Sequence, residues 1–200
     1  MTKKNVGASS ASPQKVGAKF TSPHDDNYYM SLALNQANIA YQNDDVPIGC
    51  VIVYNKNPKN KKMFDLVSKR FELKDKTQIV LSKAYNKRNK DKDATAHAEV
   101  IAIKNACKRI NDYRLEDCTM YVNLEPCQMC AGAIVQSRIK RLVIACKSEK
   151  SGSCGSIIDI LTNDSFNHKV EVVFGIKEIE SKELIADYFK KLRKRKSNNE

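Results

Sequence analysis

The chain has 200 residues, 42% of them hydrophobic and 29% charged, which is typical of one globular domain with its own core. No apolar run approaches the roughly 18 residues that a membrane helix needs, and residues 1–22 lack the apolar centre of a secretory signal. We therefore expect a cytoplasmic protein that does not use a membrane. The lysines of 1–22 leave organellar targeting open, but the absence of arginine favours a disordered basic tail.

The net charge of +12 is concentrated in three segments. Residues 1–22 carry four lysines and no acid, residues 55–78 carry eight Lys or Arg against three acids, and residues 190–200 carry six against one. The rest of the chain is close to neutral. Basic segments on a near-neutral body favour an enzyme core that acts on a polyanion.

The N-terminal half predicts a helix followed by a strand pair. Residues 25–45 predict a helix, because apolar side chains recur on one face: Tyr29, Leu32, Ala33, Ala37 and Ala40. The β-branched apolar runs 46–54 and 78–86 predict two paired, buried strands. Between them, the Lys- and Asn-rich insertion 55–77 is long for a hairpin loop, and it either extends the hairpin or is mobile.

Helices and strands alternate in the rest of the chain. We expect strands at 118–124, 139–147 and 168–176. Helices are expected from His97 to about Arg109, from Cys127 with Pro126 in the first turn, over 155–162, and over a basic C-terminal segment, 178–196. The last helix has an apolar face: Leu184, Ile185, Tyr188, Phe189 and Leu192. This alternation predicts one domain, 24–196, built as a three-layer α/β/α sandwich around a mixed sheet of about five strands.

Cys127 and Cys130 stand apart from the other cysteines, most of which lie in apolar runs and are expected to be buried thiols without disulfides. Alone, this pair could be a redox dithiol or half of a zinc ribbon, and His97 with Glu99 could be an ordinary first helical turn. Together, His97 and the two cysteines suit a tetrahedral zinc with one open position. Three ligands beside a carboxylate favour a catalytic site over a structural one.

The same residues carry a family resemblance. His97-Ala98-Glu99, followed after 26 residues by PCQMC, is similar to the H-x-E…P-C-x-x-C signature of zinc-dependent nucleobase deaminases. The strings VPIGC, TAHAE, YVNLEPCQMCAGAI and GSIIDIL…FNHKVEV resemble the tRNA-specific adenosine deaminases (TadA family) of the cytidine deaminase-like superfamily. The resemblance covers about residues 24–195 without the insertion.

The resemblance implies deamination of adenosine to inosine at the wobble position of a tRNA anticodon, in bacterial relatives that of an arginine tRNA. It implies one Zn²⁺ per subunit, held by His97, Cys127 and Cys130, which activates water for attack on C6 of adenine. Glu99 would take the water proton, pass it to the ring nitrogen and help ammonia leave. Bacterial relatives act as homodimers with a pocket lined from both chains, so a homodimer is expected.

The resemblance also implies substrate contacts. Asn86 matches an asparagine that hydrogen-bonds the flipped nucleotide, Ala98 and the backbone at Pro126 would lie against the reacting centre, and Val46, Pro47 and Ile48 would form a wall of the pocket. Ser148 stands where family members often carry an Asp or Asn that touches the nucleotide backbone, which puts this contact in doubt. The end of the last helix could bind the anticodon stem-loop through Tyr188, Phe189, Lys190, Lys191, Arg193 and Lys194. The alternative is a solvated face with two core aromatics.

Three rival functions stay open on the sequence. The same core motif occurs in deaminases of free nucleobases, nucleosides or nucleotides, of the cytidine, guanine or dCMP type. A subunit of a heterodimeric tRNA deaminase is the second rival, although its non-catalytic partners lack the glutamate that is present here as Glu99. A redox or zinc-ribbon protein is the third.

Overall fold

One mixed sheet of five strands organises the protein. The computed structural model describes residues 23–72 and 77–198, and the predicted tail, 1–22, lies outside these ranges. The strands are β1 (Gly49–Asn55), β2 (Gln78–Tyr85), β3 (Cys118–Leu124), β4 (Arg141–Cys146) and β5 (Glu171–Phe174). Their order is β2-β1-β3-β4-β5, with β1 antiparallel to β2 and β3, and with β3, β4 and β5 parallel. The predicted mixed sheet is confirmed.

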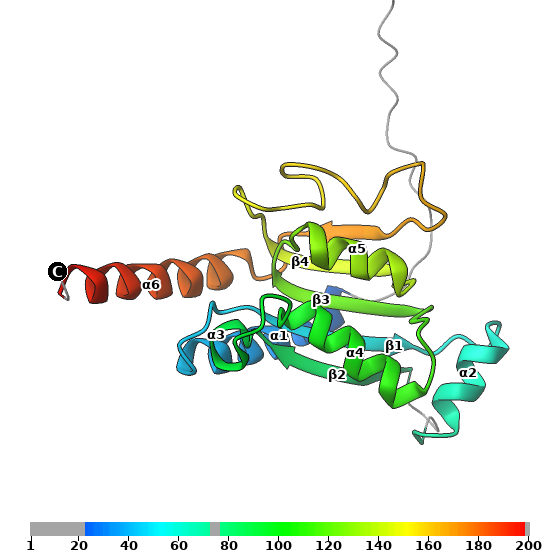
Figure 1. The fold of residues 1–200 in the computed structure, drawn as a ribbon. Coiled ribbons are helices and arrows are strands. Elements are labelled where there is room, and N and C mark those ends of the chain that lie inside the picture. Colours follow the sequence, from blue (N-terminus) through cyan, green and yellow to red (C-terminus); the bar gives the residue numbers. More distant parts are fainter. Residues whose placement is uncertain (1–22, 73–76, 199–200) are drawn as a thin grey trace, which may run out of the picture.

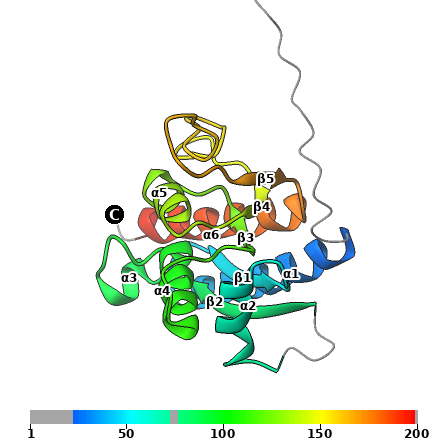
Figure 2. The same cartoon turned by 90° about the vertical axis from the view of Figure 1, so that its right-hand side faces the viewer.

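Helices cover both faces of the sheet (Figures 1 and 2). Helices α1 (Pro23–Gln42) and α6 (Glu178–Ser197) lie on one face, and α4 (Ala98–Ile110) and α5 (Gln128–Gln136) lie on the other. A short helix, α3 (Arg88–Asp91), precedes α4. These layers confirm the predicted α/β/α sandwich. Within the two described ranges, no helix combines the length and apolarity that crossing a bilayer requires.

Strand β1 shows why a continuous apolar run marks the centre of this sheet. All seven of its residues are buried, because helices cover both of its faces. Cys50, Ile52 and Tyr54 pack in the core that faces α4 and α5, while Val51 and Val53 pack in the core that faces α1. All seven cysteines of the chain are free thiols. Cys50, Cys118, Cys146 and Cys154 are buried, as expected, whereas Cys107 is half-buried.

The insertion contains a helix that the sequence did not predict. Helix α2 (Lys61–Ser68) begins after Asn60, whose side chain accepts a hydrogen bond from the amide of Met63. Met63 and Val67 are buried in the core that faces α4. The described part of the insertion is therefore docked on the body. It lies at the end of the sheet opposite to α3 and α6 (Figure 1).

Two local predictions are wrong. Residues 155–162 form turns in place of a helix, because the side chain of Asp159 accepts the amide hydrogens of Leu161 and Thr162, and Gly155 adopts a φ of +123°. Pro126 lies outside the first turn of α5, because Cys127 is the N-cap residue and Pro126 precedes it.

Candidate metal centre and adjoining cavity

The three predicted metal ligands come from the starts of two helices. His97 precedes α4 with an extended backbone (φ −78°, ψ 147°), and Cys127 precedes α5 with a similar one (φ −74°, ψ 173°). Cys130 lies within the first turn of α5. Strands β2 and β3 run in the same direction, since both are antiparallel to β1, so the segments that follow them meet at one edge of the sheet. The fold thereby brings His97 to the two cysteines.

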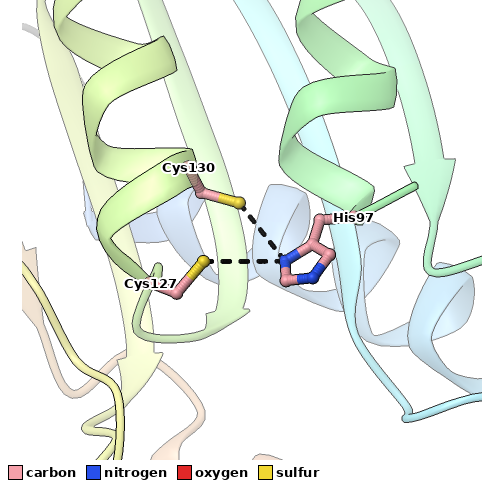
Figure 3. A group of neighbouring side chains, drawn as sticks. All are labelled: His97, Cys127 and Cys130. Carbon is pink, nitrogen blue, oxygen red and sulfur yellow. Dashed lines mark hydrogen bonds between the residues drawn. The ribbon is translucent and has the colours of Figure 1, made fainter. Parts of the chain in front are cut away.

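The geometry of these side chains fits a tetrahedral zinc. Figure 3 shows the imidazole of His97 facing both sulfurs, with its Nδ1 3.7 Å from Sγ of Cys127 and 3.5 Å from Sγ of Cys130. The three donor atoms lie within 4.8 Å of one another. Zinc with ordinary bond lengths and tetrahedral angles places nitrogen and sulfur ligands about 3.5 Å apart. The donor set therefore fits zinc and leaves a fourth position for another ligand.

The protonation of the sulfurs also favours a cation. Hydrogen bonds from the thiol of Cys130 and from His97 lower the pKa of Cys127 to about 3. The pKa of Cys130 is raised, because Cys127 and burial both disfavour a second thiolate. Two neighbouring thiolates need a compensating positive charge, which a divalent cation supplies.

Glu99 is a buried acid with an unfilled bonding position. It lies in the first turn of α4 and is 2% exposed, and burial raises the pKa of its carboxyl. In the part of the chain that the structure describes, its Oε2 is the one buried side-chain nitrogen or oxygen atom with no hydrogen-bond partner. A buried polar atom without a partner is unfavourable unless a ligand completes it. Glu99 is therefore suited to exchange protons with a molecule bound at the metal centre.

A cavity of about 440 Å³ opens beside His97, and this volume suits a small-molecule ligand. It lies between the start of β1, the segment that follows β4, and α6. Five of the predicted substrate contacts line it: Val46, Ile48, Asn86, Ser148 and Phe189. The other lining residues are Arg88, Leu124, Lys147, Glu149, Lys150, Ser151 and Ile185.

Three predicted contacts lie behind the cavity wall. Pro47 is buried, and its carbonyl accepts a hydrogen bond from Asn123. Ala98 is buried, and its amide donates to Oδ1 of Asn86 at 3.1 Å, which orients the Asn86 side chain. Pro126 is buried, and its carbonyl accepts the amide hydrogen of Ser153. These residues shape the site through their backbone atoms.

The predicted contacts of α6 divide between two sides of the helix. Phe189 lines the cavity beside His97, whereas Tyr188 and Lys191 line a second cavity of about 600 Å³ between α1 and α6. Lys191 also pairs with Asp187 at 3.1 Å. Lys190, Arg193 and Lys194 are exposed on α6. The structure does not bring these cations, or Tyr188, to the metal centre.

Three basic residues that line the cavity were not predicted from the sequence. Arg88, Lys147 and Lys150 line it, and of its lining residues only Glu149 carries an acidic side chain at the surface. Arg88 follows Asn86 by two residues, and the two lysines flank Ser148, so their proximity to predicted contacts was the available signal. The cavity therefore has a positive rim.

Glu125 fixes the segment that carries these lysines. Its carboxylate accepts the amide hydrogens of Ser148 and Cys154 at 3.0 Å and of Ser156 at 3.1 Å, and it accepts the hydroxyl of Ser156. Burial alone would raise the pKa of Glu125, but these hydrogen bonds lower it below its ordinary value. A Cβ at Gly152 would lie 2.4 Å from Oε2 of Glu125, so only glycine fits. The wall of the cavity after β4 is therefore held in one conformation.

The chain is similar in sequence to a deaminase family and to individual deaminases. Residues 24–193 match the model of the MafB19-like deaminase family. The chain is 36% identical over 171 residues to a tRNA-specific adenosine deaminase of Bacillus subtilis (strain 168), covering 86% of this chain and 92% of the relative. It is 37% identical over 166 residues to one of Aquifex aeolicus (strain VF5), covering 83% and 95%.

Solved structures of deaminases are also similar to this chain. A structure from a study of A-to-I editing by tRNA:A34 deaminases at the wobble position of transfer RNA has a TM-score of 0.65 and 32% identity, covering 78% of this chain and 98% of that one. A guanine deaminase from Nitrosomonas europaea has a TM-score of 0.60 at 17% identity, covering 81% and 83%. The second likeness shows a shared fold alone.

Proposed function

The chain belongs to the tRNA-specific adenosine deaminase family, and we propose that it converts adenosine 34, at the wobble position of a tRNA anticodon, to inosine. The observation that carries this proposal is the meeting of His97, Cys127 and Cys130 beside the buried Glu99 and an open cavity. An arginine tRNA is the proposed substrate.

The proposed cofactor is one zinc ion per chain, held by Nδ1 of His97 and by the sulfurs of Cys127 and Cys130. When bound, zinc supplies Lewis-acid chemistry that makes water a nucleophile near neutral pH. The separations of the donor atoms support this assignment.

Glu99 moves the protons of the proposed reaction. Water adds to C6 of adenine, and ammonia leaves, so one proton must pass from the water to the ring and another to the departing amine. The unpaired Oε2 of Glu99 is the proposed acceptor for the first transfer, and the same carboxyl group then donates protons to the ring and to the departing amine. Asn86 is oriented to bind the nucleotide by its hydrogen bond to Ala98, while Val46 and Ile48 provide an apolar wall.

The positive rim of the cavity favours RNA over a free nucleoside. A nucleotide extruded from a loop carries phosphates on both sides, and Arg88, Lys147 and Lys150 are placed to neutralise them. A free nucleoside offers these cations no partner. The deamination of a free nucleobase or nucleoside therefore stays the second candidate.

One assay separates the two candidates. Zinc-loaded protein is incubated with an arginine tRNA transcript and, separately, with adenosine, cytidine and guanine. We expect inosine at the wobble position, read as A-to-G on sequencing, and no ammonia from the free compounds. Turnover of a free compound with an unchanged tRNA would overturn the proposal.

We also propose that two copies of the chain associate. The exposed apolar side chains of Ile157, Ile158 and Phe166, in the segment between β4 and β5, support such an interface. The place of action proposed is the cytoplasm, and the seven unpaired thiols are compatible with its reducing conditions.

A further inference from the structure

Asn123 is a buried amide at the end of β3 that the proposed reaction does not use. It is 0% exposed, and its Oδ1 accepts the amide hydrogen of Gly49 at 2.8 Å. Its Nδ2 donates to the carbonyl of Pro47 at 3.0 Å. A backbone amide can only donate and a carbonyl can only accept, so these two partners fix the orientation of the Asn123 amide. The segment that leads into β1 is thereby held against β3.

This contact sets the position of one cavity wall. Pro47 lies between Val46 and Ile48, which both line the cavity. Gly49 has no room to move towards α1, because a Cβ there would lie 2.1 Å from the carbonyl oxygen of Ala33. Because Asn123 bonds Pro47 and Gly49, it fixes the backbone on both sides of Ile48.

The same amide also holds α6. Nδ2 of Asn123 donates to Oγ of Ser181 at 3.2 Å, and the hydroxyl of Ser181 donates to the carbonyl of Asn123 at 2.6 Å. Ser181 is fully buried in the first turns of α6, a helix whose residues are otherwise mostly exposed. Ile185 and Phe189 follow it at intervals of four residues, so all three lie on one face of the helix. Fixing Ser181 therefore fixes the rotation that turns Ile185 and Phe189 towards the cavity.

We propose that Asn123 is a positioning residue that sets the width of the substrate cavity, because it holds the Val46–Ile48 wall and α6 to one point of β3. It does not line the cavity, so it acts through these two walls. The inference rests on the proposed function only for the identity of the substrate. It predicts that Asn123 governs substrate binding and leaves proton transfer and metal binding to other residues.

The experiment compares two buried, hydrogen-bonded asparagines, one beside the cavity walls and one away from them. Asn55, at the opposite end of β1, is also buried, and its amide makes three hydrogen bonds, to Asp117, Thr119 and Gln78. Asn55→Ala is therefore a matched control for the loss of a buried amide. Steady-state kinetics with tRNA, the melting temperature and zinc content are measured for Asn123→Ala, Asn55→Ala and the milder Ser181→Ala.

We expect Asn123→Ala to raise KM for tRNA about tenfold and Ser181→Ala about threefold, with kcat within about twofold of the wild type. Asn55→Ala should lower the melting temperature to a similar extent while KM stays within about twofold. Zinc content should be unchanged in all three variants.

Equal KM values for the three variants would overturn the inference, as would a fall in kcat that follows a loss of zinc. If Asn123→Ala does not fold, Ser181→Ala decides alone, since it retains the contact with the Val46–Ile48 wall. If the wild type turns over a free nucleoside in place of tRNA, the proposed function fails, and the same KM comparison on that nucleoside decides the inference.

Discussion

Glu99 and the three proposed ligands have different environments. Glu99 is kept apart from solvent and lacks a partner for one oxygen, whereas Cys127 is held as a thiolate by hydrogen bonds from Cys130 and His97. These environments come from the starts of two adjacent helices. The proposed proton carrier and the proposed metal ligands can therefore be altered separately.

Glu99→Gln should abolish turnover while the metal stays bound. The amide keeps the shape of the side chain but cannot carry the proton, so kcat should fall by about 10²- to 10⁴-fold. Zinc content by elemental analysis and tRNA conversion are the measurements. Glu183→Gln, an exposed residue of α6, is the control and should keep full activity. A Glu99→Gln enzyme of normal rate would disprove the role of the carboxylate.

Cys130→Ser should remove the metal. A hydroxyl is a poor zinc ligand at neutral pH, so the affinity for zinc should fall by about a hundredfold or more. Competition with a chromogenic chelator measures this affinity. Cys107→Ser, at a half-buried thiol of α4, should bind zinc as the wild type does. Equal zinc affinity in the two variants would show that the metal is held elsewhere.

One side of α6 lines the cavity beside His97, and the other side is exposed to solvent. Its N-terminal turns are fixed by Ser181, and Phe189 reaches the cavity. Some of its C-terminal cations are engaged within the protein, since Lys191 pairs with Asp187 and Arg195 pairs with Asp44. Fewer phosphate contacts are therefore available from this helix than its charge suggests.

Removal of residues 190–200 should weaken tRNA binding and flatten its salt dependence. Each lost phosphate contact should reduce the slope of log K against log salt by about 0.7–0.9. Binding is measured by filter retention across a salt series, with zinc content as the check on folding. Lys59→Gln with Lys61→Gln is the control, because Lys61 begins α2 and neither lysine lines the cavity beside His97. An unchanged slope after truncation would favour a small-molecule substrate.

Different elements lie at the two ends of the sheet. Helices α3 and α6 lie at one end of the sheet, while α2 lies at the other (Figure 1). None of the described Lys or Arg residues of the insertion lines the cavity beside His97. Three exposed apolar side chains, those of Ile157, Ile158 and Phe166, lie in the segment between β4 and β5.

The oligomeric state should depend on that apolar segment. Ile157 and Ile158 are 55% and 49% exposed, and Ile157→Ser with Ile158→Ser should convert the proposed dimer to a monomer. Light scattering and sedimentation measure the mass in solution. Ile179→Ser, at an isoleucine of α6 that is 71% exposed, should leave the dimer intact. A wild-type monomer would contradict the proposed assembly.

The sequence by itself determined the strands, and it predicted the ligand set and the acid that the structure brings together. Strand β1 is readable because seven consecutive residues are buried, and the ligands are readable because His97 and Glu99, like Cys127 and Cys130, lie within one helical turn of each other. Patterns this short can be recognised in the sequence without knowledge of the fold. The family resemblance then predicted that the pattern of His97 and Glu99 and the pattern of Cys127 and Cys130 form one site.

Only the tertiary structure decided how the cavity is built. Asn123 meets Ser181 across 58 residues of sequence, and Glu125 meets Ser156 across 31, so no local pattern reports these contacts. Likewise, the orientation of α6 places Phe189 in the cavity beside His97 and Tyr188 in the cavity between α1 and α6. The burial of Met63 and Val67 stabilises α2 as a helix in a segment that the sequence did not predict to be helical. Hydrogen bonding and burial depend on partners that the fold supplies, and these terms override local propensity.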